Sequence, residues 1–280
     1  MPAPPPLPHG ACAAREQEGR PEPQGRRGLT ALIPTYNEEA NLQECLDSVS
    51  WCDEVLVVDS FSTDRTVEIA RRAGARVLVH DYVNSAAQKN WAIPQASHEM
   101  VLVVDADERV TPELREEIRN LLAQGPGADA YAIRRANFFL GRRVRHGGWE
   151  ADRVIRLFRR DKGRYQQREV HADIETAGPV PELRSPLLHY TFRSFSQYWP
   201  KIQRYSDWGA SQAFSEGRRA GFGSVLLRPG GRFLKMYLLR LGFLDGVHGL
   251  VLCMLAAFSV YLKYAKLWEM GLRERGSSGG

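Results

Sequence analysis

The sequence predicts an α/β fold in which a mostly parallel sheet is covered by helices. Short apolar runs alternate with stretches of helical periodicity in the first half of the chain, and helix-end signals fall between the runs. This alternation is typical of parallel strands joined by crossover helices. The runs that we expect to form strands are Leu29–Pro34, Val55–Asp59, Ala75–His80 and Met100–Asp105.

The segments that follow these runs carry apolar residues at helical spacing. Such spacing covers residues 42–49 and 67–73, and Gly74 then provides a residue suited to a C-terminal cap. After the fourth run, Thr111 and Pro112 have the order of an N-cap and a first helical residue. The apolar residues that follow on one face are Leu114, Ile118, Leu121 and Leu122.

Length and composition are those of an ordinary globular protein. The chain has 280 residues, of which 25% are charged and 43% hydrophobic, enough for one large domain with appendages. The net charge of +5 suits the phosphates of a nucleotide or of a lipid surface, but charge alone does not indicate nucleic acid, and we expect none as a partner. The four cysteines show neither a metal-binding nor a disulfide spacing, which fits a reducing cytosol.

Both ends of the chain are predicted to lie outside the folded part. Residues 1–27 are rich in proline and lack the apolar run of a signal peptide, so we expect a disordered tail and no secretion signal. Residues 273–280 end in Gly-Ser-Ser-Gly-Gly and are expected to be flexible. Between them we expect an α/β domain over residues 28–195 and a helical region over residues 196–272.

Polar residues follow the predicted strands, where open parallel sheets bind their ligands. Asp59 ends the second run, Asp105 ends the fourth, and Asp107 comes two residues later. If the backbone stays extended, Asp105 and Asp107 project to the same side, and two such carboxylates can hold Mg²⁺ or Mn²⁺ with help from phosphate oxygens and water. No glycine-rich phosphate loop follows the first run, which disfavours a dinucleotide enzyme or a P-loop NTPase.

Three sequence blocks in order resemble the catalytic core of family 2 glycosyltransferases, which has the GT-A fold, a mostly parallel Rossmann-like sheet flanked by helices. The blocks are LIPTYNEEANLQECLDSV, DEVLVVDSFSTDRTVEIA and VLVVDADERVTPEL, within Leu29 to about Glu117. The later segments RLFRRDKGRY, VHADIE and GFLDG are similar to the subgroup that adds glucose to the heptose-containing inner core of lipopolysaccharide. This similarity spans roughly Leu29 to Met270.

The resemblance implies an inverting, metal-dependent transferase that uses Mg²⁺ or Mn²⁺. It would move a hexose, expected to be glucose from UDP-glucose, to a hydroxyl of a membrane glycolipid such as the lipopolysaccharide core. The expected place of work is the cytoplasmic face of the inner membrane.

The resemblance also implies roles for individual residues. Asp107 matches the metal ligand with Asp105 beside it, and His171 of the VHADIE segment could complete the metal or diphosphate site. The segment departs from the subgroup at Ala172, which stands where glutamate is usual, and Asp59 is followed by serine where many members have aspartate or glycine. The residues implied to bind the nucleotide are Pro34, Tyr36, Glu38, Asp59, Lys89, Asn90 and Asp105.

An inverting transfer needs a base to accept the proton of the acceptor hydroxyl. Two adjacent glycines give the backbone latitude before Glu150 and Asp152. Asp152 matches the position of the family's general base, and Glu150 is its competitor. A surface ion pair between Asp152 and a neighbouring arginine is the alternative interpretation.

Other polar and aromatic residues of this region have two interpretations each. Arg156 and Arg159 could contact phosphate or could be solvated strand residues. For His189, Tyr190 and Trp149 the sequence favours packing.

The predicted helical region has the composition of a membrane-associating segment. Residues 246–262 contain no formally charged residue, a stretch slightly short of the roughly 20 residues that a span needs. Basic residues interleave with aromatic and aliphatic ones between Arg228 and Arg240, and again up to Trp268. This mixture suits a helix or helical hairpin in the membrane interface, so we expect peripheral attachment rather than a span. A buried core helix or an oligomer contact is the alternative.

Three other functions are compatible with parts of the pattern. Transfer of a sugar to polyprenyl phosphate would need a pocket for the acceptor phosphate. A nucleotidyltransferase shares the architecture and the metal aspartates, but its glycine-rich, lysine-bearing loop is absent after the first run. A non-catalytic protein that binds sugar nucleotides is disfavoured because Asp105, Asp107 and Asp152 are all present.

Overall fold

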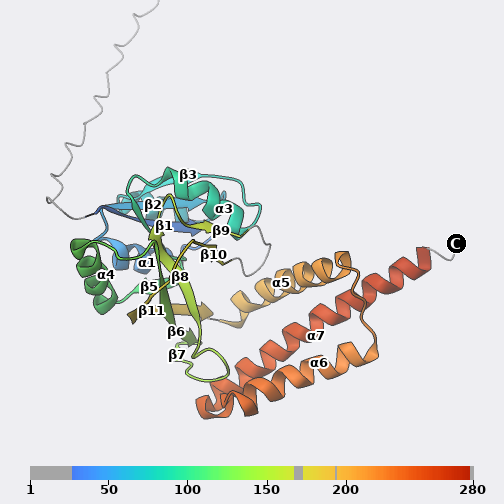
Figure 1. Ribbon diagram of the computed structural model, residues 1–280. Helices are drawn as coiled ribbons and strands as arrows, with labels where there is room; N and C mark the ends of the chain where they lie inside the picture. The colour runs from blue at the N-terminus through green and yellow to red at the C-terminus, as the bar shows by residue number, and fades with distance from the viewer. Residues whose placement is uncertain (1–26, 167–172, 193, 278–280) are drawn as a thin grey trace, which may run out of the picture.

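The computed structural model describes residues 27–166, 173–192 and 194–277. Within these residues an α/β domain is followed by three long helices that project from it (Figure 1). The tail predicted for residues 1–27 lies, except for Arg27, outside the described residues. The last helix continues to Ser277, and the end of the tail predicted for residues 273–280 also lies outside them.

The described residues form one nine-stranded sheet and a small second sheet. β1 is parallel to β2 and β4, β2 is parallel to β3, and β11 is parallel to β6, whereas β8 runs antiparallel to β4 and β6. The predicted α/β fold with a mostly parallel sheet is thereby confirmed. The strands in spatial order are β3 (Arg76–Val79), β2 (Glu54–Asp59), β1 (Leu29–Thr35), β4 (Met100–Val103), β8 (Arg153–Arg159), β6 (Ala130–Phe139), β11 (Glu182–Phe192) and β5 (Glu108–Val110), with β7 (Arg142–Arg143) paired to β6, and β9 (Arg164–Tyr165) paired to β10 (Ile174–Glu175) in the second sheet.

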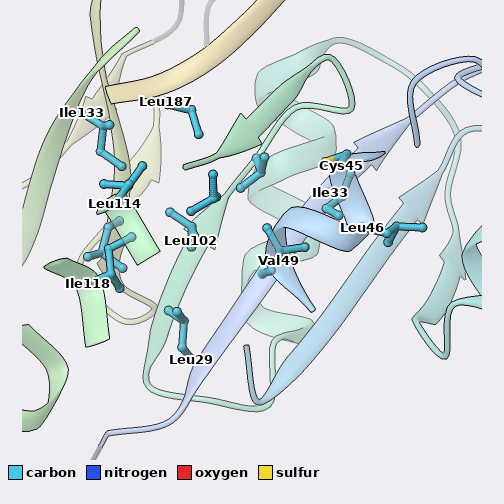
Figure 2. Close-up of a cluster of buried hydrophobic side chains, with 14 of the residues drawn as sticks. Leu29, Ile33, Cys45, Leu46, Val49, Leu102, Leu114, Ile118, Ile133 and Leu187 are labelled. Carbon is cyan, nitrogen blue, oxygen red and sulfur yellow. The ribbon is translucent and has the colours of Figure 1, made fainter. Parts of the chain in front are cut away.

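Helices cover both faces of the sheet because successive strand side chains point to opposite sides. On β1, Leu29, Ala31 and Ile33 contribute to one buried cluster, and Leu32 contributes to the other. Figure 2 shows the first cluster, in which residues of the sheet pack against two flanking helices. The helices of the first cluster are α1 (Leu42–Val49), α2 (Thr66–Arg72) and α4 (Pro112–Gln124), and α3 (Ser85–Ala92) covers the other face.

The helix ends follow the sequence signals where these are strong. The Thr111 hydroxyl accepts a hydrogen bond from the Leu114 amide at 3.1 Å, and Pro112 is the first residue of α4. Gly74 has a φ of 78°, the left-handed conformation that favours glycine after a helix. Helix α3 has no strong apolar periodicity and is defined by its N-cap, where the Asn84 side chain accepts from the Ala87 amide at 2.8 Å.

The C-terminal region consists of α5 (Phe195–Ser215), α6 (Phe222–Leu234) and α7 (Gly246–Ser277). A π-helical segment, Lys235–Leu239, and a 3₁₀ segment, Gly242–Asp245, join α6 to α7, so that these two helices run antiparallel beside each other (Figure 1). Within the described residues, one helical stretch, Gly242–Arg275, is long and apolar enough to cross a membrane. Only 22% of its most apolar window is buried in the protein.

The packing of the first cluster predicts that two residues one turn apart on α4 contribute very differently to the free energy of unfolding. Ile118 is fully buried, whereas Leu121 is partly exposed. Ile118→Ala should lower the free energy of unfolding by about 2–5 kcal/mol, because it removes buried methyl groups and leaves a cavity. Leu121→Ala, the matched control, should cost clearly less in the same urea titration. Equal losses would show that the first cluster does not pack as described.

Candidate active site

Acidic side chains gather where the parallel strands end. Glu38 follows β1, Asp59 ends β2, and Asp105 and Asp107 follow β4. Burial raises the pKa of the Glu38 carboxyl, a hydrogen bond from Asn41 opposes this, and the charges of Asp107 and Asp105 add to the increase. Three carboxylates are therefore close enough to repel one another.

Asp105 and Asp107 lie in a turn rather than in an extended strand. β4 ends at Val103, the Glu108 amide donates to the Asp105 carbonyl at 2.8 Å, and the Asp105 amide donates to the Glu108 carboxylate at 3.0 Å. The extended backbone that would send both side chains to one side does not continue beyond β4. The two carboxylates consequently meet different partners.

Asp105 belongs to a cluster of charged side chains beneath this turn. Its Oδ1 atom lies 2.8 Å from Lys89 Nζ, and its Oδ2 atom accepts a hydrogen bond from Arg156. Arg156 also lies 2.7 Å from Glu108, and Arg135 lies 3.4 Å from the same carboxylate. Burial alone would raise the pKa of Asp105, but the charges of Arg156 and Lys89 hold it well below its usual range. Asp105 is therefore ionised, and both of its oxygens are paired.

Asp107 has more distant partners. Its Oδ2 atom lies 3.7 Å from His189 Nε2 on β11 and 4.0 Å from Lys201 Nζ on α5. Burial would raise the pKa of Asp107, but His189 and Lys201 lower it. The other ring nitrogen of His189 lies 2.6 Å from Asn137 Oδ1, a contact that orients the imidazole. Asp107 is thus an ionised carboxylate, and the nearest atoms of His189 and Lys201 lie 3.7 and 4.0 Å from it.

The groups around Asp107 fit a divalent cation better than those around Asp105. Asp107 offers a carboxylate oxygen and His189 an imidazole nitrogen, ligand types that metals such as Mn²⁺ accept. No cluster of three or more His, Cys, Asp or Glu side chains able to hold a metal occurs in the described part of the chain. The remaining ligands of a bound Mg²⁺ or Mn²⁺ would have to come from a phosphate and from water, as is common for these ions.

Asp152 is tied to two neighbouring side chains of β6. Its carboxylate receives two hydrogen bonds from Arg135, at 2.8 and 2.9 Å, and one from Asn137 at 2.9 Å. Burial would raise the pKa of Asp152, but Arg135 and Asn137 lower it. Because Asn137 also contacts His189, one side chain joins the surroundings of Asp152 to those of Asp107. The alternative of a surface pair with Arg153 or Arg156 is not what these contacts show.

Glu150 has a looser environment. It accepts a hydrogen bond from the Gly148 amide at 2.8 Å, and it lies 3.6 Å from Arg240 Nη1. Its side chain is exposed. The two candidate bases are therefore close in sequence but differ in how firmly their carboxylates are held.

Among the residues expected to bind the nucleotide, Asp59 shapes the loop that follows β2. The buried carboxylate accepts hydrogen bonds from the Thr35 hydroxyl at 3.0 Å and from the Ser62 amide and hydroxyl at 2.8 and 2.5 Å. Ser60, the serine that departs from the family pattern, is buried, and its hydroxyl accepts a hydrogen bond from the Gln88 side chain at 2.6 Å. Pro34 is partly buried, and Tyr36 is exposed at the same edge.

Lys89 and Asn90 are adjacent on α3 but point to different partners. Lys89 is buried against Asp105, and its ammonium also lies 5.3 Å from the centre of the Tyr165 ring. Both polar atoms of the Asn90 side chain bond the Tyr165 backbone, each at 2.8 Å. Asn90 therefore positions β9. His171 lies outside the described residues.

Several residues of the site carry no distinctive sequence signal. Glu108, Arg135 and Asn137 lie on strands where polar residues ordinarily face solvent, and Lys201 lies on a helix of the C-terminal region. The sequence favours packing for His189 and does not indicate that this side chain lies near Asp107, as it does in the structure. Only the pairing of β11 with β5 and β6 brings this histidine to the site.

Fold and site together define an α/β protein with carboxylates at the ends of its parallel strands and buried cations beside them. A sequence profile described as Glycosyl transferase family 2 matches residues 30–180, more than half of the chain. The chain belongs to glycosyltransferase family 2. The GT-A-like fold that the sequence blocks imply agrees with this assignment.

Similar proteins cover nearly the whole chain. The lipopolysaccharide core biosynthesis glycosyltransferase LpsC of Rhizobium meliloti is 32% identical over 248 residues, which are 86% of this chain and 92% of LpsC. An uncharacterized glycosyltransferase of Rickettsia typhi is 29% identical over 88% of this chain and 89% of its own length.

A solved structure of lower similarity is glucosyl-3-phosphoglycerate synthase of Mycobacterium tuberculosis. Its structure in complex with Mn²⁺, uridine diphosphate and glucosyl-3-phosphoglycerate matches with a TM-score of 0.34 and 25% identity. The match spans 40% of this chain and 44% of that one. The family assignment therefore rests on the sequence matches.

The charge cluster predicts an acid-sensitive fold. Because the pKa of Asp105 is lower in the folded than in the unfolded chain, its contribution to stability is present above about pH 4 and is lost as the pH falls further. Asp105→Asn should lower the unfolding free energy at neutral pH by about 3 kcal/mol, the low end for breaking a buried ion pair, since Asp105 itself is 31% exposed. It should also flatten the loss of stability below pH 4. Parallel pH profiles for both proteins, measured by urea unfolding, would contradict this account.

Proposed function

We propose that the chain is an inverting, metal-dependent glycosyltransferase that moves glucose from UDP-glucose to a hydroxyl of a membrane glycolipid such as the lipopolysaccharide core. The observation that carries the proposal is the separation of two neighbouring aspartates: Asp105 is neutralised by protein cations, whereas Asp107 is not bound closely by them. Family membership supports sugar transfer, and the similarity to LpsC supports the class of acceptor.

In this proposal Asp107 and His189 hold the metal ion. When bound there, Mg²⁺ or Mn²⁺ would supply Lewis-acid neutralisation of the diphosphate leaving group. Lys201, whose side chain is 40% exposed, adds a positive charge next to the same carboxylate. Asp105 keeps Lys89 and Arg156 in place beneath the nucleotide, while Asn137 holds the His189 ring in a fixed orientation.

Two buried polar atoms support a ligand on the nucleotide side. Among the described residues, Arg156 Nε and the Tyr165 hydroxyl are buried without a hydrogen-bond partner. Such groups are rare in folded proteins unless water or a ligand satisfies them. Both belong to residues that surround Lys89, the side chain bound to Asp105. A nucleotide at this edge of the sheet would provide the missing acceptors.

Asp152 is the proposed base for the acceptor hydroxyl, with Glu150 as the alternative. Its lowered pKa keeps Asp152 ionised at neutral pH, the form that can accept a proton. Asn137 fixes the position of Asp152 relative to His189 and hence to the metal side of the site. The proposed base is thus a different carboxylate from the proposed metal ligand, and Asn137 joins it to the metal side of the site.

The proposed place of action is the cytoplasmic face of the inner membrane, with peripheral attachment. The apolar stretch Gly242–Arg275 supports membrane association. No residue of α6, which lies wholly within the described part of the chain, is buried, although the helix is rich in apolar side chains. Such a helix suits the membrane interface.

Metal dependence is tested by chelation and by a single substitution. Transfer from UDP-glucose to a lipopolysaccharide-core acceptor should stop in excess EDTA and return with Mn²⁺. Asp107→Ala should weaken binding of UDP at least about tenfold and leave binding of uridine nearly unchanged, because only the diphosphate contacts the metal. Asp47→Asn, an exposed carboxylate on α1, is the control. Full transfer in EDTA would refute the metal role.

The two candidate bases are distinguished by replacing each carboxylate with the corresponding amide side chain. Asp152→Asn should reduce turnover by roughly 10²–10⁴-fold, the usual contribution of a positioned base, with little change in UDP-glucose affinity. Glu150→Gln should have a much smaller effect. Reversed effects would identify Glu150 as the base. If neither variant loses turnover in steady-state kinetics, the base does not lie in this loop.

A further inference from the structure

The connection between α6 and α7 is fastened to the loop that precedes Asp152. We call residues 235–247 the hairpin turn and residues 145–150 the clamped loop. The buried Asp245 carboxylate accepts hydrogen bonds from the Arg145 amide at 3.1 Å and the His146 amide at 2.8 Å. A third contact joins it to His146 Nδ1 at 3.2 Å, and the Gly147 amide donates to the Arg240 carbonyl at 2.8 Å. The hairpin turn thus binds the backbone of three successive residues.

Small residues give the hairpin turn a fixed shape. A Cβ atom on Gly249 would lie 1.9 Å from the Gly242 carbonyl oxygen, and one on Gly242 would lie 2.8 Å from Cys253 Sγ. Leu241 and Gly246 have positive φ angles of 55° and 62°. The GFLDG segment, which has no role in the proposed chemistry, therefore specifies a tight turn that side chains larger than hydrogen would disrupt.

The clamped loop leads directly to the proposed base. The Trp149 carbonyl accepts from the Asn137 side chain at 3.3 Å and from the Asp152 amide at 3.4 Å. Glu150 lies beside Arg240 of the hairpin turn. A displacement of the hairpin turn would consequently move both candidate bases.

The outer side of the hairpin turn is apolar and is bordered by basic residues. Leu239 is 79% exposed and Val247 is 72% exposed. Exposed basic residues lie on the turn, at Lys235 and Arg240, and on β7 beside it (Figure 1). The exposed apolar side chains of the turn are Leu238, Leu239, Leu241, Phe243, Leu244 and Val247.

This combination fits an anionic lipid surface. Apolar side chains gain by leaving water for the acyl region, and basic side chains around them are attracted to acidic headgroups. We propose that the hairpin turn inserts into the membrane surface and that Asp245 holds the clamped loop at a fixed position relative to the lipid. The second part rests on the proposed function: Asp245 is a positioning residue that sets the acceptor side of the site at the height of a lipid-linked sugar.

Insertion is tested with vesicles and the full chain. Leu239→Ser combined with Leu244→Ser should reduce partitioning onto phosphatidylcholine vesicles containing phosphatidylglycerol at least about tenfold. Val83→Ser, which changes an equally exposed residue of the α/β domain, should have no effect. Binding should also weaken with salt and in vesicles of phosphatidylcholine alone. Unchanged partitioning of the double variant, or a change in its oligomeric state instead, would overturn the proposal.

The positioning role is tested by Asp245→Asn, which keeps the size of the side chain and removes its charge. The amides of Arg145 and His146 should exchange hydrogen faster, and kcat/KM for the lipid-linked acceptor should fall at least about tenfold, while vesicle and UDP binding stay unchanged. Asp207→Asn, an exposed carboxylate of α5, is the control. Slow exchange of these amides in the variant, or undiminished transfer, would overturn the role of Asp245.

The two hypotheses fail in different ways. If the wild-type chain transfers no sugar from any nucleotide donor, the proposed function fails, whereas vesicle partitioning and amide exchange still decide whether the hairpin turn inserts and clamps. Transfer that responds to Asp107→Ala but not to Asp245→Asn would leave the proposed function intact and refute the positioning role.

Discussion

The interaction on which the site depends is the balanced group of charges beneath the turn after β4. Three carboxylates, of Asp105, Glu108 and Asp152, are paired with Lys89, Arg156 and Arg135. Charges removed from water destabilise a fold unless each is paired and hydrogen-bonded, and here every carboxylate has a cation within hydrogen-bond distance. The group joins α3, β5, β6 and β8, so that it fixes the elements around the ends of the parallel strands. The charges of this group compensate one another. Asp107 lies beside the group, and its carboxylate can therefore still attract a positive ion.

This balance explains why two aspartates separated by one residue have different surroundings. Asp105 is neutralised by Lys89 of α3 and Arg156 of β8, whereas Asp107 faces β11 and α5 across gaps of 3.7 and 4.0 Å. Asn137 extends the arrangement from His189 to Asp152. Beyond it, the clamped loop connects the site to the hairpin turn. The surroundings of Asp107, the candidate base Asp152 and the C-terminal helices are therefore joined by one continuous set of contacts.

Much of the fold could be predicted from the sequence, because local patterns of apolar and capping residues determine these strands and helices. The first four strands follow from apolar runs, and α4 follows from Thr111 and Pro112. Helix α3 could not be predicted, since its start is set by the Asn84 cap and it has no strong apolar spacing. Asp105 and Asp107 could be found because they follow a strand directly. His189, Asn137 and Lys201 could not, since only the pairing of β11 with β6 and the placement of α5 bring them close.

The central claim is that Asp107 and His189 hold the metal while Asp105 serves the protein's own cations. Electron paramagnetic resonance of Mn²⁺ bound with UDP tests this most directly, because a coordinated imidazole couples its nitrogen to the metal spin. The wild-type protein should show this nitrogen coupling, and His189→Asn should abolish it while Mn²⁺ still binds through Asp107 and the diphosphate. A spectrum without nitrogen coupling in the wild type, or one that His189→Asn leaves unchanged, would contradict the account.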